Sequence, residues 1–379
     1  MRNYLLSGVA ALCLVPAAAV RAADAPNVVV SIQPIHSLVA GVMDGVGEPA
    51  LIVRGAGSPH AYALKPSEAE ALQQADLVVW VGENLESFLV DAIPNLATNA
   101  HVVELVETPG VMTLEYREGD NWEDHAHDDH DDHAEHDDHD DHAEHDDHDD
   151  HDHDDHAEHD DHDHDDHAEH DDHDDHDEHG EHDHDDHGHD DHAEHDDHDG
   201  HDDHAHEGAD AHIWLDPDNA KAIVTIVVDE LVEMDPDNAA AYQANGDRLT
   251  GEIDAMSAEI AAKLEPVGDR PYLVFHDAYQ YFGDHFGADA VGSVVVSPER
   301  QPGAARIAAI QDRLADEEIV CVFREPQFSP RVIDTIIEGT DVRVGVLDPL
   351  GAEYEPGPAL YGQLMNGIAD GLVDCLVEG

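Results

Sequence analysis

The sequence predicts an α/β fold with two lobes, each built on a small parallel sheet flanked by helices, joined by one long rigid helix. Short apolar runs alternate with helical patterns in both halves of the chain, which is typical of parallel α/β sheets. Between the halves, apolar residues keep helical spacing over about 30 residues. The 379 residues suffice for two domains with cores of their own.

The first lobe is expected to span residues 24–235. Its four predicted strands are apolar runs at 27–32, 50–53, 77–81 and 101–105. Apolar side chains at helical spacing predict a helix over 34–44. A second helix is expected over 67–75, with Ser67 as its N-cap and Glu70 three residues on, as in a capping box.

Two helices are predicted to begin after the polar segment 123–207. Asp216-Pro217 begins a helix that runs to about Met234, with proline at the first helical position. Asp235-Pro236 repeats the signal, and apolar residues then continue at helical spacing to Leu264. We expect this second helix, residues 236–266, to join the lobes.

The second lobe is expected to span residues 267–379. Its predicted strands lie at 271–275, 290–296, 318–323 and 342–347. Helical patterns over 303–314 and 331–338 lie between them, which repeats the α/β rhythm of the first lobe.

Residues 123–207 interrupt the first lobe and break every pattern. They contain 45 of the 91 acidic residues and 30 of the 36 histidines, and the block at 131–139 repeats unchanged at 140–148. With almost no apolar side chain to bury, this insert is predicted to be disordered without metal. Dense histidine with aspartate and glutamate offers many weak metal sites, so we expect the insert to gather or sense a metal ion for a nearby site, the alternative being an acidic segment that only aids solubility.

The formal charge of −76 does not come from the insert alone, since the remainder holds 46 acidic residues against 15 basic ones. Such a surface repels nucleic acid and anionic membranes and attracts cations. No nucleic-acid partner is therefore expected.

The N-terminus has the pattern of a signal peptide. A short positive start precedes an apolar stretch over residues 5–20, which ends in the mostly small residues Ala17-Ala18-Ala19-Val20-Arg21-Ala22. We expect residues 1–23 to be removed, with cleavage near Ala22 or Ala23, and the protein to be exported. The alternative is a retained membrane anchor, for which the stretch is short.

Two cysteines remain after this removal, Cys321 and Cys375. An even pair in an exported chain suggests a disulfide. Two buried thiols are the alternative.

Metal ligands are expected among the six histidines outside the insert. His60 lies in a loop after a strand, His276 and Asp348 each directly follow a predicted strand, and His212 opens the helix after the insert. Ligands in open α/β sheets bind beyond the carboxyl ends of strands. Three imidazoles with one oxygen suit Zn²⁺ in tetrahedral geometry.

Other polar residues near these positions are expected to have structural or solvent-exposed roles, not to bind the metal. Asp277 is expected either to orient His276 or to be an exposed carboxylate. Glu83 and Glu86 are expected as solvated loop charges. The remaining histidines outside the insert are expected to be structural: His36, His101 and His285.

Four motifs resemble, in order, the ligand motifs of the periplasmic zinc-binding proteins of ABC transporters (ZnuA-type). They are Gly57-Ser58-Pro59-His60-Ala61-Tyr62, His212-Ile213-Trp214-Leu215-Asp216-Pro217, Phe275-His276-Asp277-Ala278-Tyr279 and Leu347-Asp348-Pro349-Leu350-Gly351. The resemblance covers nearly the whole mature chain. It implies a metal buried between two lobes, ligand roles for His60, His212 and His276, and a carboxylate nearby at Asp348. It also implies a disulfide in the second lobe and an acidic, His-rich insert before the second motif.

The resemblance further implies a function. The protein is expected to be periplasmic, to bind Zn²⁺ tightly and to deliver it to an inner-membrane ABC permease. A periplasmic zinc chaperone is a further candidate partner, and a monomer is expected. An enzyme is not expected, because the sequence has neither a His-Glu-x-x-His run nor a Gly-x-Ser-x-Gly elbow.

Two alternatives stay open. The first is a manganese or other divalent-metal binding protein of the same transporter class, whose manganese-binding members typically have Glu where His276 stands. The second is a zinc buffer or adhesin without a role in transport.

Overall fold

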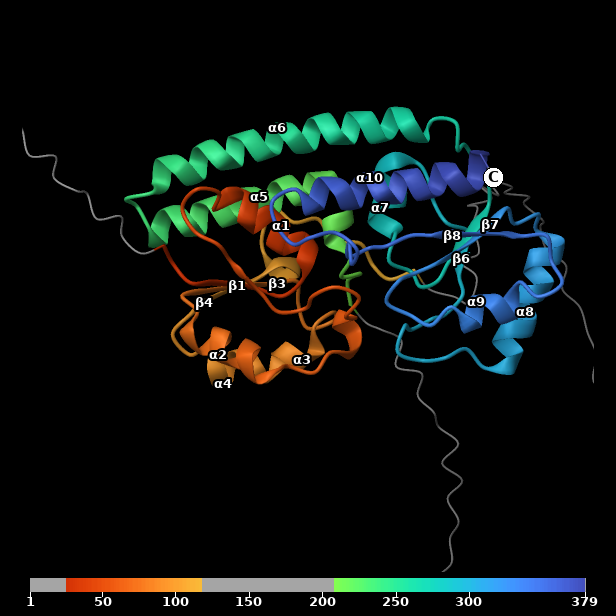
Figure 1. The fold of residues 1–379 in the computed structure, drawn as a ribbon, viewed down its shortest axis with the longest axis horizontal. Helices are drawn as coiled ribbons and strands as arrows, with labels where there is room; N and C mark the ends of the chain where they lie inside the picture. The colour runs from red at the N-terminus through yellow and green to blue at the C-terminus, as the bar shows by residue number, and fades with distance from the viewer. Residues whose placement is uncertain (1–24, 118–207, 379) are drawn as a thin grey trace, which may run out of the picture. The chain divides into compact units, whose positions relative to one another are not determined.

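The computed structural model describes residues 25–117 and 208–378 (Figure 1). The first lobe contains a four-stranded parallel sheet in the order β2-β1-β3-β4. Its strands are β1 (Val28–Val30), β2 (Ala50–Leu51), β3 (Leu77–Trp80) and β4 (His101–Glu104). All residues of β1 and β3 are buried, as expected for central strands of a parallel sheet covered on both faces.

The second lobe repeats this topology with a parallel sheet in the order β6-β5-β7-β8. Its strands are β5 (Tyr272–Val274), β6 (Gly292–Ser293), β7 (Cys321–Arg324) and β8 (Arg343–Val346). All eight strands lie within the segments that the apolar runs predict, apart from a one-residue extension of β7 to Arg324. The predicted two-lobe α/β class is therefore confirmed.

Helices connect the strands in both lobes. In the first they are α1 (Gln33–Val42), α2 (Pro66–Gln74), α3 (Ser87–Val90) and α4 (Ala92–Leu96), with short 3₁₀ turns η1 (Pro59–Ala61) and η2 (Leu105–Glu107). In the second they are α7 (Gln280–Phe286), α8 (Ala304–Asp316), α9 (Arg331–Ile336) and α10 (Leu360–Val373), followed by a π-helical turn at Asp374–Glu378.

The expected cap of α2 is wrong. The helix begins at Pro66 with Lys65 as N-cap, and the backbone N–H of Lys65 donates to Glu68 Oε2 at 2.8 Å. Proline at the first helical position needs no amide partner and already has a helical φ. The start therefore lies earlier than Ser67.

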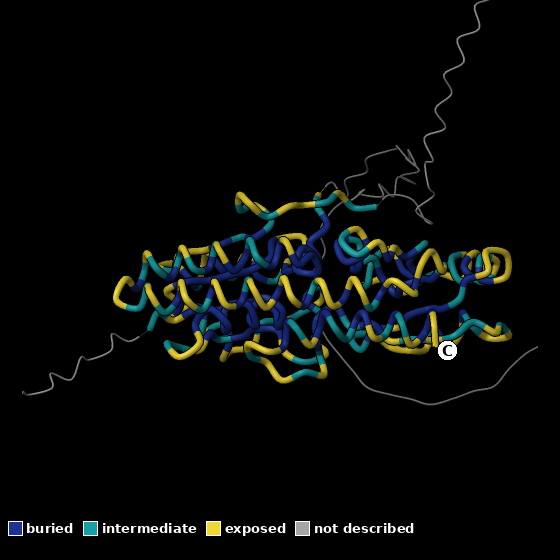
Figure 2. Tube along the Cα trace, turned by 90° about the horizontal axis from the view of Figure 1, so that it is seen from above, coloured by how far each residue is buried: buried dark blue, intermediate teal, exposed yellow. Residues whose placement is uncertain are grey.

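The 3₁₀ turn η3 (Ile213–Leu215) leads into α5 (Pro217–Met234), and α6 (Ala239–Leu264) follows. Figure 1 shows α6 running along the first lobe to α7 at the start of the second, and it packs against α5 and α10. A Cβ on Gly246 would lie 2.6 Å from Val228 Cγ2, so glycine permits the close approach of α5 and α6. Exposed and buried residues alternate along these helices (Figure 2).

One hydrophobic core extends through both lobes. It includes residues of the first sheet, of α5 and α6, and of α10 near the C-terminus. Because α10 packs against α1 as well as α6, the second lobe is attached to the first by apolar contact and not by α6 alone. The expected domain bounds at 235, 266 and 267 stay predictions.

A disulfide joins Cys321 of β7 to Cys375 in the final turn, with a Cα–Cα distance of 6.3 Å. The cysteine pair thus forms the bridge expected in the second lobe. Residues 1–23 and the insert at 123–207 lie outside the described residues. Among those described, no helix combines the length and the apolar character that crossing a membrane requires.

Candidate metal centre

His60 lies on the short turn η1, after β2. Pro59 opens this turn and is buried, which fixes the backbone directly before the histidine. The His60 side chain is 14 % exposed, and Glu299 Oε1 lies 3.9 Å from Nδ1. Within the described segments, 25–117 and 208–378, no carboxylate is in hydrogen-bond contact with this ring.

His212 precedes η3 and is buried. Asp210, which is fully buried, holds it twice. Asp210 Oδ1 accepts from the His212 backbone N–H at 3.0 Å and lies 2.7 Å from His212 Nδ1. This contact makes Nδ1 the protonated nitrogen and turns Nε2 toward the centre.

His276 follows β5, at the carboxyl end of that strand. Its partner is Glu325, which directly follows β7, the neighbour of β5 in the sheet. Glu325 Oε1 lies 2.8 Å from His276 Nδ1, and both residues are buried. Here too a carboxylate holds Nδ1 and leaves Nε2 facing the centre.

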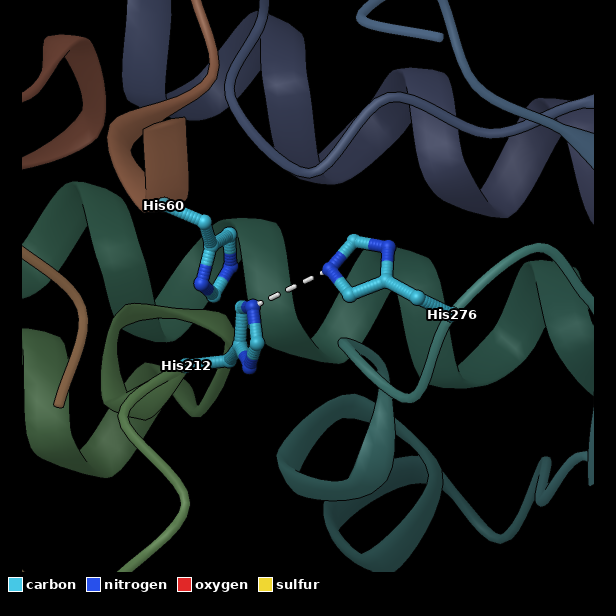
Figure 3. A group of neighbouring side chains, drawn as sticks. All are labelled: His60, His212 and His276. Atoms are coloured by element: carbon cyan, nitrogen blue, oxygen red, sulfur yellow. Dashed lines mark hydrogen bonds between the residues drawn. The ribbon is translucent and has the colours of Figure 1, made fainter. Parts of the chain in front are cut away.

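The three histidines come together although they lie far apart in the sequence (Figure 3). Their ligand-capable nitrogens all lie within 4.8 Å of one another. The ring centroids are 5.6 Å apart for His60 and His212, 5.6 Å for His60 and His276, and 5.2 Å for His212 and His276.

The contact between the two carboxylate-bound rings is chemically informative. His212 Nε2 and His276 Nε2 lie 3.3 Å apart. A neutral imidazole carries one N–H, and in both rings the carboxylate claims it at Nδ1. Two nitrogen lone pairs thus face each other, which is favourable only with a proton or a cation between them. Zn–N bonds of about 2.0–2.1 Å in a tetrahedron put neighbouring nitrogens about 3.3–3.4 Å apart.

The electrostatics of the three rings differ. Burial, followed by the neighbouring His212 and His276, lowers the pKa of His60 well below its ordinary value, which keeps this ring neutral and able to bind a metal. Burial acts in the same direction on His276, but the carboxylate of Glu325 outweighs it and raises the pKa of His276.

Asp348 lies outside this group of nitrogens. Its Oδ1 accepts from the side chain of Gln327 at 2.7 Å and from the backbone N–H groups of Leu350 and Gly351 at 3.0 Å each, and its Oδ2 accepts from Ala352 N–H at 2.6 Å. In this arrangement the carboxylate shapes the loop 348–352.

Sequence reasoning missed Asp210 and Glu325. The rule that found His276 and Asp348 at strand ends applies equally to Glu325, which is the first residue after β7. Asp210 stands two residues before His212, a spacing that lets its side chain reach the imidazole.

Two other carboxylates differ from expectation. Asp277 neither orients His276 nor stands free in solvent, because the guanidinium of Arg117 forms an ion pair with it. Glu86 is fully buried instead of solvated, and its carboxylate accepts from the backbone N–H groups of Val81 and Gly82 at 3.3 and 2.9 Å.

The lining of the site fits a small cation with a bound water. A cavity of about 10 Å³, close to the size of one water, lies among the three histidines, Leu85, Trp214 and a loop of the second lobe. Three buried oxygens of its lining have no protein partner in the described part of the chain: Ser58 Oγ, Glu325 Oε2 and Gln327 Oε1. Acceptors of this kind suit the hydrogens of a metal-bound water.

A second group of possible ligands consists of Asp216, Asp218 and His285. Its contacts already explain it. Asp216 caps α5 by accepting from Asp218 N–H at 2.7 Å and pairs with His285 Nδ1 at 3.0 Å, and Asp218 pairs with Lys221. A helix N-terminus also disfavours a cation.

The remaining histidines have structural surroundings. His36 Nε2 lies 3.0 Å from the carbonyl of Pro49, and His101 pairs with Glu230 on the surface. Neither belongs to the groups of possible metal ligands among residues 25–117 and 208–378.

Comparison with known proteins gives consistent matches. The family model for the periplasmic zinc-uptake complex component A, ZnuA, matches residues 28–375. The chain is 46 % identical over 355 residues to the high-affinity zinc uptake system protein ZnuA of Brucella abortus (strain 2308), covering 94 % of this chain and 93 % of the relative. It is 38 % identical over 355 residues to the protein of the same name from Paracoccus denitrificans, covering 93 % of each.

Among solved structures, a crystal structure of ZnuA is similar with a TM-score of 0.63 at 19 % identity, over 93 % of this chain and 100 % of that one. The periplasmic zinc-binding protein TroA from Treponema pallidum gives a TM-score of 0.64 at 17 % identity, over 93 % and 99 %. These two likenesses concern the fold.

Proposed function

Because the chain belongs to the ZnuA family of periplasmic zinc-uptake components, we propose that it captures Zn²⁺ between its two lobes outside the cytoplasmic membrane and delivers it to an ABC transporter permease. The observation that carries this proposal is the pair of Nε2 atoms of His212 and His276, 3.3 Å apart with both Nδ1 atoms held by carboxylates. His60 supplies the third nitrogen.

The donor set favours zinc over manganese. Neutral imidazole suits Zn²⁺, whereas Mn²⁺ prefers carboxylate and other oxygen ligands. Asp210 and Glu325 act behind the ligands: they orient the rings and make the nitrogens more basic. The three rings therefore offer a nitrogen-rich site with one open position.

The fourth position has two candidate occupants. Asp348 reaches the metal only by releasing some of its four hydrogen bonds, while the unpartnered oxygens of Ser58, Glu325 and Gln327 favour a water. We infer that water completes the coordination in the arrangement described, with Asp348 as a ligand only after its loop rearranges.

We infer a binding protein and not a hydrolase. A zinc hydrolase needs room for an organic substrate beside the metal-bound water. The cavity of about 10 Å³ gives no such room. A monomeric state, a periplasmic zinc chaperone as second partner, and signal-peptide cleavage near Ala22 or Ala23 remain part of the proposal.

Competitive calorimetry with Zn²⁺ and Mn²⁺ tests the proposal, using mature protein with and without residues 125–206. We expect one tight zinc site in the shortened protein, lost in His60→Ala and in His276→Ala. His101→Ala is the matched control, because this surface histidine lies outside the centre, and it should bind zinc as the parent does.

Two results would contradict the proposal. Absence of a tight site from the shortened protein would mean that the insert holds the zinc. Tighter binding of Mn²⁺ than Zn²⁺ would favour a manganese carrier of the same transporter class.

A further inference from the structure

The amide side chain of Gln33 bonds to both loops that frame the metal centre. Gln33 is the first residue of α1 and is 3 % exposed. Its oxygen and its nitrogen have partners in different lobes, so the two loops are connected through one side chain.

On the side of the first lobe, Gln33 Oε1 accepts from the backbone N–H of Gly55 at 2.7 Å. Gly55 has a φ of +60°, a conformation that glycine adopts easily, and here the chain turns into the segment that ends at η1. The hydrogen bond thus fixes the start of the loop that carries His60.

On the side of the second lobe, Gln33 Nε2 donates to the carbonyl oxygens of Leu350 and Gly351 at 3.2 and 2.9 Å. The N–H groups of the same two residues donate to Asp348 Oδ1, each at 3.0 Å. Leu350 also lines the cavity of the metal centre. The loop 348–352 is therefore held from inside by Asp348 and from the first lobe by Gln33.

A contact from the second ligand turn reinforces this connection. Trp214 Nε1, two residues after His212, donates to the carbonyl of Pro349 at 2.8 Å. The loop 348–352 consequently receives hydrogen bonds from residues linked to two of the three histidines. The amide of Gln33 meets both demands, because one loop offers a donor and the other offers acceptors.

We propose that Gln33 is a positioning residue for zinc: it couples the His60 loop to the loop 348–352 and thereby keeps His60 at the spacing that the ion requires. This inference rests on the proposed zinc-binding function. Gln33 touches no ligand atom, so it acts through the backbone of both loops.

Two variants of the full mature chain separate the halves of this coupling. Gln33→Met keeps the volume and loses all three hydrogen bonds. Gln33→Glu, measured at pH 8, keeps an acceptor for Gly55 but no donor for Leu350 and Gly351. Gln74→Ala is the matched control, because Gln74 lies exposed on α2 and its side chain donates to Glu70 one turn away at 3.3 Å.

Zinc release to a chelator and amide exchange of the zinc-free protein give independent readouts. We expect the slow phase of release to be about tenfold faster in both Gln33 variants, the effect of losing two or three neutral hydrogen bonds. Exchange at Gly55 should be faster in Gln33→Met only. The Gln74 variant should match the parent in both measurements.

The outcomes are separable. If Gly55 exchanges faster in Gln33→Met while zinc leaves at the parent rate in both variants, the hydrogen bond exists but does not position the ligand, and the inference is overturned. Unchanged exchange at Gly55 overturns it as well. If zinc release from the parent protein shows no slow phase, the proposed zinc site itself is refuted. The amide exchange of Gly55 still reports whether Gln33 holds the His60 loop.

Discussion

The two lobes have the same sheet topology, and each buries a carboxylate in the segment that follows the third strand of its sheet. Glu86 comes after β3 and Glu325 after β7, and they are 0 % and 3 % exposed. Glu86 faces backbone N–H groups, whereas Glu325 faces the imidazole of His276.

This difference shows that a buried carboxylate beyond a strand can serve two purposes. Burial raises the pKa of Glu86 to about 7, because the hydrogen bonds that its carboxylate accepts only partly offset the loss of solvent. The Glu325 carboxylate has an imidazole N–H as its partner and raises the pKa of His276. A buried carboxylate becomes part of the metal centre only where a histidine provides that proton.

The largest expected effect on stability comes from removing the disulfide of the second lobe, since the first lobe contains no cysteine. Replacing both cysteines, Cys321→Ser with Cys375→Ser, should lower the free energy of unfolding by about 4 kcal/mol, the loop-closure value for a separation of 54 residues. Urea unfolding of metal-free protein measures this. A loss below about 1 kcal/mol would show that the second lobe does not depend on its disulfide.

The next largest effect is the pH dependence of stability that buried Glu86 causes. Its pKa in the native state lies above the unfolded value, so native protein holds a proton that unfolded protein releases, and stability falls as pH rises from about 4.5 to about 7. The loss amounts to about 3 kcal/mol. Glu86→Gln should lack this decline in denaturant titrations between pH 4.5 and 8 with chelator present. Parallel curves for variant and parent would place the titration elsewhere.

A smaller effect is expected for zinc affinity. Glu325→Ala should weaken the tight site about 10- to 100-fold, because His276 loses the group that orients it. Glu86→Gln should change it less than about threefold, which calorimetry would resolve. Asp277→Ala is a second control, since its partner is Arg117. Equal losses in all three variants would mean that the effect is general destabilisation.

The smallest expected change in affinity follows deletion of residues 125–206. The tight site should be unaffected, because its three histidines are held by the lobes. Uptake under chelation should nevertheless fall if the insert gathers zinc for the centre. Uptake equal to that of the parent under scarce zinc would rule out the delivery role.

Most of the fold was predictable from local pattern. Every strand falls in or at the edge of a segment rich in apolar residues, although β6 itself is only Gly292–Ser293. Such segments are recognisable without knowledge of their partners. The position of His276 was predictable because it lies beyond the carboxyl end of a parallel strand, whereas His212 opens a helix and His60 lies on a turn after β2. Family resemblance added their order and the expectation of a metal between the lobes.

The surroundings of the ligands were less predictable. Glu325 is 49 residues from His276 in the sequence, and only the pairing of β5 with β7 brings them together. Asp277 is adjacent to His276, yet its side chain points to Arg117. Sequence proximity therefore suggested the wrong partner, while sheet order determines the right one.

The shared core has a consequence for how long an ion stays bound. Parting the lobes would expose the face of α10 that packs on α1 and α6, including Tyr361, Leu364, Met365 and Ile368. Each square ångström of apolar surface so exposed costs roughly 25 cal/mol. Spontaneous separation is correspondingly rare, so we expect zinc held between the lobes to leave slowly unless a partner at the membrane parts them.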